Sequence, residues 1–279
     1  MKKSIIFFSI FLFANDISKS FPDLIQDYKN RETKDTVKQI FSRNFNLYPY
    51  QTNYVLPATW DFDKKSGRKQ FETKFQISIM KIFGNNFLGQ DELYFAAYTQ
   101  TSWWQTAEAS TPFRETNYQP EIFVLFPMEK YHKNFDAWVF AINHQSNGKP
   151  VATSRSWNRI YTKVLFHYEK VIFNVRIWYR IPEPAKKTPD DPNGDDNPDI
   201  EDYLGYGDLK IIYPYKDNLL TSLIRYNPHT RKGAIELDYS KPIRNDVFLY
   251  IQYFNGYGES LIDYNRLTNR IGIGVAYSR

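Results

Sequence analysis

Apolar and polar residues alternate with a period of two along most of the chain after residue 50. This is the spacing of β-strands whose two faces lie in different environments. In the run 171–181 every odd position is apolar or aromatic, whereas the even positions include Asn174, Arg176 and Arg180. Most such segments are close to the ~9–11 residues that a tilted strand needs to cross a bilayer. The pattern predicts twelve strands, near 54–61, 74–83, 92–105, 121–128, 136–146, 158–168, 171–181, 203–213, 219–227, 233–240, 247–257 and 269–278.

The connections between these segments alternate in length. Those after the even-numbered segments are mostly short, and most of those after the odd-numbered ones are longer and polar. Short periplasmic turns and longer extracellular loops are typical of outer membrane barrels, and an even strand number places both termini on the periplasmic side. The sequence therefore predicts an all-β fold, a twelve-stranded antiparallel transmembrane β-barrel.

A soluble β-sandwich is the alternative fold, because its inner faces would also carry the large apolar residues. The faces opposite the apolar ones decide between the two. They carry Arg159, Lys163, Asn174, Arg176 and Arg180. Charges at this density do not suit a sandwich core but suit a polar barrel interior.

Composition further narrows the possible classes of protein and of functional site. Aromatic residues make up 18% of the chain while the mean hydropathy is −0.58, which does not suit a helical membrane protein. There is no cysteine, which excludes disulfides, thiolate metal sites and a cysteine nucleophile. The net charge of +5 is spread through the strand-like segments, and no motif supports a nucleic-acid partner.

The N-terminus reads as an export signal over residues 1–20. Lys2 and Lys3 precede an apolar run, Ile5 to Ala14, that is too short to span a bilayer as a helix. Residues 21–50 are polar and mixed, so we expect a periplasmic lead-in there and the barrel domain over 51–279.

Candidate chemistry lies at the ends of two neighbouring segments. The apolar face of 136–146 ends in His144 and Ser146, and the apolar face of 158–168 begins with Asn158. If the two segments pair as a hairpin, these three side chains meet at one end of a lipid-facing wall. A histidine beside a serine can act as base and nucleophile in acyl transfer. The alternative is that the histidine is an ordinary packed or surface side chain, because a His and a Ser two apart also occur by chance.

Several longer motifs give the chain a family resemblance. It resembles the bacterial outer membrane phospholipase A family from about residue 90 to the C-terminus. The matching motifs are Tyr-Thr-Gln-Thr-Ser-Trp-Trp-Gln (98–105), Pro-Phe-Arg-Glu-Thr-Asn-Tyr (112–118), His-Gln-Ser-Asn-Gly (144–148), Ser-Arg-Ser-Trp-Asn-Arg (154–159), Asp-Asp-Asn-Pro-Asp-Ile (195–200) and Gly-Tyr-Gly-Glu-Ser-Leu-Ile-Asp-Tyr-Asn (256–265).

The resemblance implies hydrolysis of the sn-1 and sn-2 acyl esters of phospholipids and lysophospholipids. By position, Ser146 would be the nucleophile, His144 the general base and Asn158 the residue that orients the imidazole. The backbone N–H of Gly148 would stabilise the oxyanion. An asparagine in the third position adds no charge to a wall that faces lipid, where an ion is costly.

The resemblance also implies a Ca²⁺ site between two subunits. Its ligands would be Lys149 and Ser154 of one chain and Ser110 of the other, and such a weakly held hard cation suits few protein oxygens and several waters. Asp196 matches a carboxylate that holds calcium in the monomer. Val151 stands where family members can carry a second aspartate, which weakens the expectation of a monomer-state site.

We therefore expect an outer membrane enzyme of a Gram-negative bacterium that acts as a homodimer on membrane phospholipids, with its active site facing the outer leaflet. Gln100 matches a polar interface position of the family. A buried amide at a membrane contact would favour pairing. Two alternatives remain: a small porin-like or structural barrel without catalysis, and a soluble secreted esterase.

Overall fold

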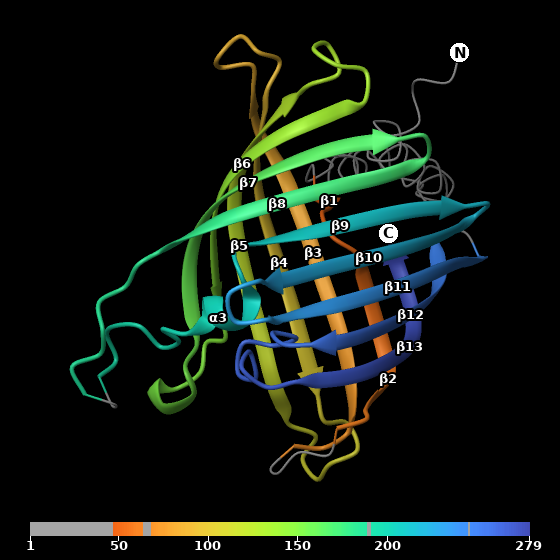
Figure 1. Cartoon of the computed structure of the whole chain (residues 1–279). Coiled ribbons are helices and arrows are strands. Elements are labelled where there is room, and N and C mark those ends of the chain that lie inside the picture. Colours follow the sequence, from red (N-terminus) through yellow and green to blue (C-terminus); the bar gives the residue numbers. More distant parts are fainter. Residues whose placement is uncertain (1–46, 64–67, 189–190, 245) are drawn as a thin grey trace, which may run out of the picture.

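A computed structural model describes residues 47–63, 68–188, 191–244 and 246–279 (Figure 1). The expected signal segment and most of the expected lead-in lie outside the described residues. Within these ranges a single antiparallel sheet contains β1 (Leu47–Pro49), β2 (Asn53–Asp61), β3 (Phe71–Asn85), β4 (Leu93–Trp104), β5 (Phe113–Pro127), β6 (Phe135–Ser146), β7 (Ser156–Tyr168), β8 (Val171–Ile181), β9 (Gly207–Tyr215), β10 (Asn218–Asn227), β11 (Lys232–Arg244), β12 (Val247–Gly256) and β13 (Thr268–Ser278).

The sheet closes on itself. From β2 to β13 each strand pairs with its neighbour in sequence, and β13 pairs with β2, where the Asn53 N–H donates to Ser278 Oγ at 3.0 Å. Strand β1 pairs with β3 directly beyond the stretch that pairs with β2. The two short strands thus share one position in the ring, and the expected twelve-stranded antiparallel barrel is confirmed. The sheet begins a few residues before the expected boundary at residue 51.

No described helix has the length and apolar character needed to cross a bilayer. The short helices lie in connections: η1 (Val151–Thr153) between β6 and β7, and α3 (Ile200–Leu204) between β8 and β9. Helix α3 ends at Gly205, whose φ of 69° is in the left-handed region that favours glycine.

Alternation along β6 separates the two faces as predicted. Ala137, Val139 and Ala141 are buried inside the barrel, whereas Phe140 and Ile142 are exposed on the outer wall. The cationic residues on the other faces also point inward. Arg159 and Arg180 are buried, and Lys163, Asn174 and Arg176 line an interior cavity of about 250 Å³.

Two differences from the expected elements concern polar segments. Strand β5 begins at Phe113, eight residues before the expected start at 121, and β9 begins at Gly207 because Ile200–Leu204 is helical. The first half of β5 does not show the alternation of apolar and polar residues, because its buried positions are polar: Glu115 and Asn117 lie inside the barrel. Alternation of hydrophobicity cannot find a strand whose inner face is made of carboxylate and amide groups.

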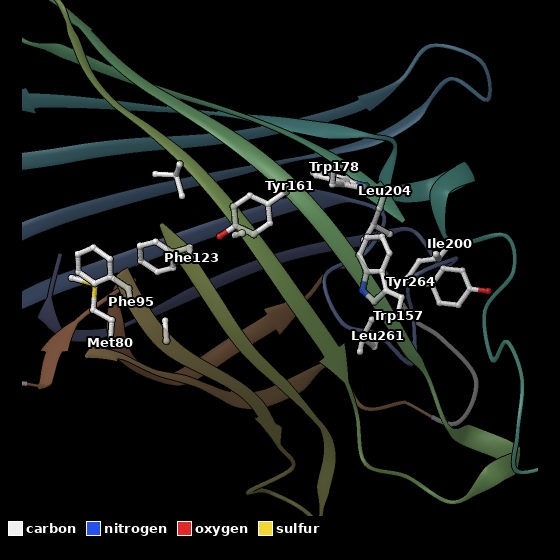
Figure 2. Packing of buried hydrophobic residues seen from close by; sticks show 13 residues of the cluster. Met80, Phe95, Phe123, Trp157, Tyr161, Trp178, Ile200, Leu204, Leu261 and Tyr264 are labelled. Atoms are coloured by element: carbon white, nitrogen blue, oxygen red, sulfur yellow. The ribbon is translucent and has the colours of Figure 1, made fainter. Parts of the chain in front are cut away.

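Long connections and α3 gather at one end of the barrel (Figure 1). At this end Trp157, Ile200, Leu204, Leu261 and Tyr264 form a section of the buried apolar cluster, as Figure 2 shows. The connections that follow β6, β8 and β12 are thereby packed together, and they surround the end of the β6–β7 hairpin.

Candidate active site

The β6–β7 hairpin places His144 and Asn158 directly opposite each other. Both side chains are partly exposed, and His144 follows Ile142, which is 63% exposed on the outer wall. His144 Nδ1 lies 2.9 Å from Asn158 Oδ1. An amide oxygen can only accept, so Nδ1 is the protonated nitrogen in this contact and Nε2 is left with its lone pair.

Ser146 lies on the same face, two residues after His144 at the end of β6. Its cross-strand neighbours are Ser156 on β7 and Tyr118 on β5. Among the described residues its hydroxyl has no hydrogen-bond partner. The hairpin thus brings the three predicted residues to one end of one wall, with the His–Asn contact formed. A contact between serine and base often tightens only when substrate binds.

The loop after Ser146 is held by the buried Asn147. Asn147 Oδ1 accepts from the Arg155 N–H at 2.9 Å and from the Lys149 N–H at 3.4 Å, and Nδ2 donates to the Thr153 carbonyl at 3.0 Å. One side chain therefore spans the loop. This restrains the backbone at Gly148, which lies between Asn147 and Lys149, two residues that the same hydrogen bonds hold.

Gly148 needs to be a glycine for two reasons. Its φ is 61°, in the left-handed region, and a Cβ there would lie 3.1 Å from the ring of Tyr118. Its N–H belongs to the loop that follows Ser146 directly. A glycine there can present a backbone donor near a nucleophile without interference from a side chain.

Hydrogen bonds tie this loop to the interior of the barrel. Glu115 Oε2 accepts from Asn147 Nδ2 at 3.5 Å, and Oε1 of the same carboxylate accepts from the Ile262 N–H at 3.1 Å. Asn117 Oδ1 accepts from the Leu261 N–H at 2.9 Å. The connection after β12 therefore folds against β5 and supports the hairpin end from inside.

The same inner connection carries a buried carboxylate, Glu259. It contacts Arg270 Nε at 3.2 Å, Lys74 Nζ at 3.3 Å and Arg68 NH2 at 3.4 Å. Burial raises the pKa of Glu259, but these cations and Arg114 outweigh burial and hold the pKa well below its usual range. This end of the interior is thus closed by charge pairs.

Asn158 has a second partner just beyond the end of the next strand, β8. Its Nδ2 donates to Glu183 Oε1 at 3.1 Å. Glu183 lies two residues beyond Ile181, which is directly opposite Asn158 in the β7–β8 pairing. The amide is therefore held on both sides, by the imidazole through its oxygen and by a carboxylate through its nitrogen.

The predicted calcium ligands are spread over three connections. Ser154 Oγ donates to Asp196 Oδ2 at 2.6 Å, and Lys186 Nζ lies 2.6 Å from Asp196 Oδ1. Lys149 lies in the same loop as Ser154, whereas Ser110 is exposed in the connection after β4 at a φ of 62°. Within the ranges that the structure describes, no group of three or more carboxylates and histidines could hold a metal ion.

The donor set still fits a hard cation in kind, because carbonyl and hydroxyl oxygens of Lys149 and Ser154 are the ligands that calcium prefers. The carboxylate of Asp196 fits less well. It is already paired with the ammonium of Lys186, so a metal ion would have to compete with that charge.

Sequence reasoning missed three residues at this site: Asn147, Glu183 and Lys186. A signal existed for Glu183, since it continues the outward parity of Tyr179 and Ile181 along the same strand direction. The register of β7 with β8 was needed to place it beside Asn158. The contacts of Asn147 and Lys186 depend on loop conformation, for which the sequence offers no period.

Comparison with known proteins agrees with this geometry. The phospholipase A1 family model matches residues 29–277. Phospholipase A1 of Escherichia coli K12 is 40% identical over 247 residues, which cover 83% of this chain and 81% of the relative. A putative phospholipase A1 of Neisseria meningitidis is 41% identical over 227 residues, which cover 77% of this chain and 57% of the relative.

Solved structures are similar over most of the barrel. Outer membrane phospholipase A from Escherichia coli has a TM-score of 0.76 at 37% identity, covering 90% of this chain and 94% of that chain. An active-site mutant of it, with an asparagine replaced by alanine, has a TM-score of 0.75 at the same coverage. The Salmonella typhi outer membrane phospholipase dimer with bound calcium has a TM-score of 0.76 at 38% identity, covering 84% and 93%. The chain belongs to the phospholipase A1 family.

Proposed function

We propose that this outer membrane phospholipase hydrolyses the sn-1 and sn-2 acyl esters of phospholipids and lysophospholipids through Ser146, His144 and Asn158, as a calcium-dependent homodimer. One observation carries the proposal. The His144–Asn158 hydrogen bond lies on the lipid-facing wall, two residues from Ser146, where an ester of a membrane lipid can reach it.

The geometry supports a two-step acyl transfer. His144 Nε2 takes the proton of the Ser146 hydroxyl as its oxygen attacks the ester carbonyl, and the same proton then passes to the leaving alcohol of the lysophospholipid. The acyl group is now esterified to Ser146. Water, deprotonated by His144, attacks this ester, and the fatty acid leaves as the serine regains its proton.

Asn158 holds the imidazole in the tautomer that this sequence of steps needs. The solved active-site mutant of the Escherichia coli relative replaces an asparagine, the residue type found here opposite the histidine. The Gly148 N–H, at the turn after the serine, would donate to the oxyanion of the tetrahedral intermediates.

Calcium would be held by the Lys149 carbonyl, by Ser154 and by Ser110 of a second copy of the chain. The Salmonella typhi relative is a dimer with bound calcium, which supports both elements of this proposal. When bound, the ion would supply positive charge near the oxyanion. Gln100 supports pairing, because it lies on the outer wall in line with Tyr118 and Ser146 across β4, β5 and β6.

The arrangement of connections supports an outer-leaflet site. The hairpin end that carries His144 and Ser146 lies at the end of the barrel with the long connections (Figure 1). Long connections face the exterior in outer membrane barrels. The site would then lie at the level of the outer-leaflet ester groups.

The test is Ser146→Ala, with Ser156→Ala as a matched control. Ser156 is the cross-strand neighbour of Ser146 on the same wall. We expect Ser146→Ala to lose hydrolysis of mixed-chain phospholipid and labelling by a fluorophosphonate, while it still assembles as a heat-modifiable barrel. Ser156→Ala should keep both. Mass spectrometry of the released chains gives the sn-1 and sn-2 shares. Full hydrolysis by Ser146→Ala would refute the assignment.

A further inference from the structure

The side-chain amide of Asn158 poses a problem that its contact with His144 alone does not solve. Rotation of the amide by half a turn exchanges an acceptor for a donor at nearly the same position. With the oxygen toward His144, Nδ1 carries the proton and Nε2 is a base. With the nitrogen toward His144, the neutral ring places its proton on Nε2 and cannot deprotonate Ser146. Something has to distinguish the two orientations.

The described contacts of Asn158 contain such a group. Glu183 Oε1 accepts from Asn158 Nδ2 at 3.1 Å, while Asn158 Oδ1 lies 2.9 Å from His144 Nδ1. A carboxylate can only accept, so it binds the NH₂ side of the amide and excludes the reversed orientation. We propose that Glu183 is a positioning residue of the active site, acting through Asn158; this rests on the proposed function of His144 and Ser146.

The backbone places Glu183 there. Ile181 is directly opposite Asn158, and Glu183 lies two residues further along, with Pro182 between them. Side chains two apart share a face. Proline lacks an N–H and fixes its φ, so the strand direction continues past the last β8–β7 pair without a further ladder bond. Glu183 is partly exposed, so its charge is at the watery end of the wall rather than among the apolar side chains below.

The charge of Glu183 has a second effect. A carboxylate beyond the amide favours the imidazolium that forms when His144 holds the serine's proton. The asparagine keeps this charge one residue away from the ring. Catalysis thus gains some of the benefit of a Ser-His-acid site while the residue in contact with the histidine stays neutral.

Two substitutions separate the two effects. Glu183→Ala removes both the acceptor and the charge, and we expect kcat to fall about five-fold, as for loss of one ordinary, partly exposed hydrogen bond. The acid limb of its pH–rate profile should move to lower pH by about half a unit. Glu183→Gln can still accept through Oε1 but can also donate, so it should restore only part of kcat and show the same displaced limb. Imidazole ¹⁵N NMR of His144 should show the Nε2-protonated tautomer growing in Glu183→Ala, and growing less in Glu183→Gln.

The control is Glu169→Gln, which removes a carboxylate from the exposed turn between β7 and β8 at the opposite end of the barrel. It should leave kcat and the pH profile as in the wild type. If Glu183→Ala shows neither a lower kcat nor a displaced limb, the role of Glu183 is wrong. Loss of kcat without any change in the limb or in the tautomer would reduce Glu183 to a structural residue and also overturn the proposal. An active Ser146→Ala would instead refute the proposed function itself.

Discussion

At the same end of the barrel, the outer wall and the interior differ in how charged groups are placed. On the wall His144 contacts the neutral amide of Asn158, and the carboxylate of Glu183 contacts that amide rather than the histidine. Inside, Glu259 is buried among arginines and a lysine. An ion is costly next to hydrocarbon, whereas inside the barrel each ion can be surrounded by counter-ions.

This difference gives the outer wall and the barrel interior separate roles. The wall carries few groups whose removal would weaken the barrel, so it can be given over to chemistry. The interior carries the groups that hold the long connections in place, including the loop behind Ser146 through Glu115 and Asn147. Substitutions on the wall should therefore change activity, and substitutions in the interior should change stability.

The largest expected effect is on the wall. His144→Ala removes the proposed general base, and we expect hydrolysis to fall about 10³-fold with the midpoint of urea unfolding unchanged. His167→Ala is the matched control, because His167 lies at the other end of β7, where its Nδ1 is 2.7 Å from Asp136 Oδ1. It should hydrolyse lipid at the wild-type rate. A hydrolysis rate in His144→Ala within ten-fold of wild type would contradict the separation.

The interior should respond in stability. Glu259→Gln leaves three buried cations facing a neutral amide, and we expect the free energy of unfolding to fall by about 3 kcal/mol. Glu108→Gln is the control: its pair with Lys69 at 3.2 Å is largely exposed, and loss of that pair should cost well under 1 kcal/mol. Urea unfolding of the barrel in lipid vesicles measures both. Equal losses in the two variants would mean that the interior ions are as well solvated as surface ones.

Glu259 also determines how the stability of the folded barrel should change with pH. The pKa of Glu259 is lower in the folded barrel than in the unfolded chain, because the neighbouring cations outweigh burial. Its contribution to stability is therefore present above the ordinary glutamate pKa and is lost as the pH falls below that value. The protection of the connection after β12 against hydrogen exchange, relative to the intrinsic rate at each pH, should fall in acid in the wild type. In Glu259→Gln this protection should depend less on pH.

The smallest expected effect lies where the two regions meet, in the loop after β8. Lys186 neutralises Asp196, so Lys186→Met should free the carboxylate for a metal ion. We expect calcium to bind about five- to ten-fold more tightly, as measured by calorimetry on the detergent-solubilised protein. Lys187→Met, which removes an exposed neighbouring ammonium, should change the affinity little. Unchanged affinity in Lys186→Met would show that Asp196 is not a calcium ligand.

Alternation in the sequence predicted the ring of strands and the face on which His144, Ser146 and Asn158 lie, because each strand separates lipid from a polar interior. It also predicted their meeting at one end, since side chains on the same face of two strands paired as a hairpin come together at the joined ends. The cationic inward face was enough to favour a barrel over a sandwich.

The features that the sequence did not predict lie in segments without an alternation of apolar and polar residues. The first half of β5 has Glu115 and Asn117 on its inner face, so hydrophobicity does not mark it as a strand. Glu183 and Lys186 lie beyond the end of β8, where side-chain contacts follow from the path of a polar connection. The catalytic roles, the calcium ligands and the dimer remain proposals on which the variants above bear.

The hairpin register has one more consequence. His144 and Asn158 are 14 positions apart in the chain and meet as soon as β6 and β7 zip together, whereas the ring is closed by β2 and β13 from its two ends. The histidine–asparagine contact is therefore a local product of folding, formed once the hairpin forms. A cell that needs this enzyme idle in an intact membrane cannot rely on disassembling the pair. Under the proposed function, the restraint would come from what reaches this contact: lipid, a metal ion or a second barrel.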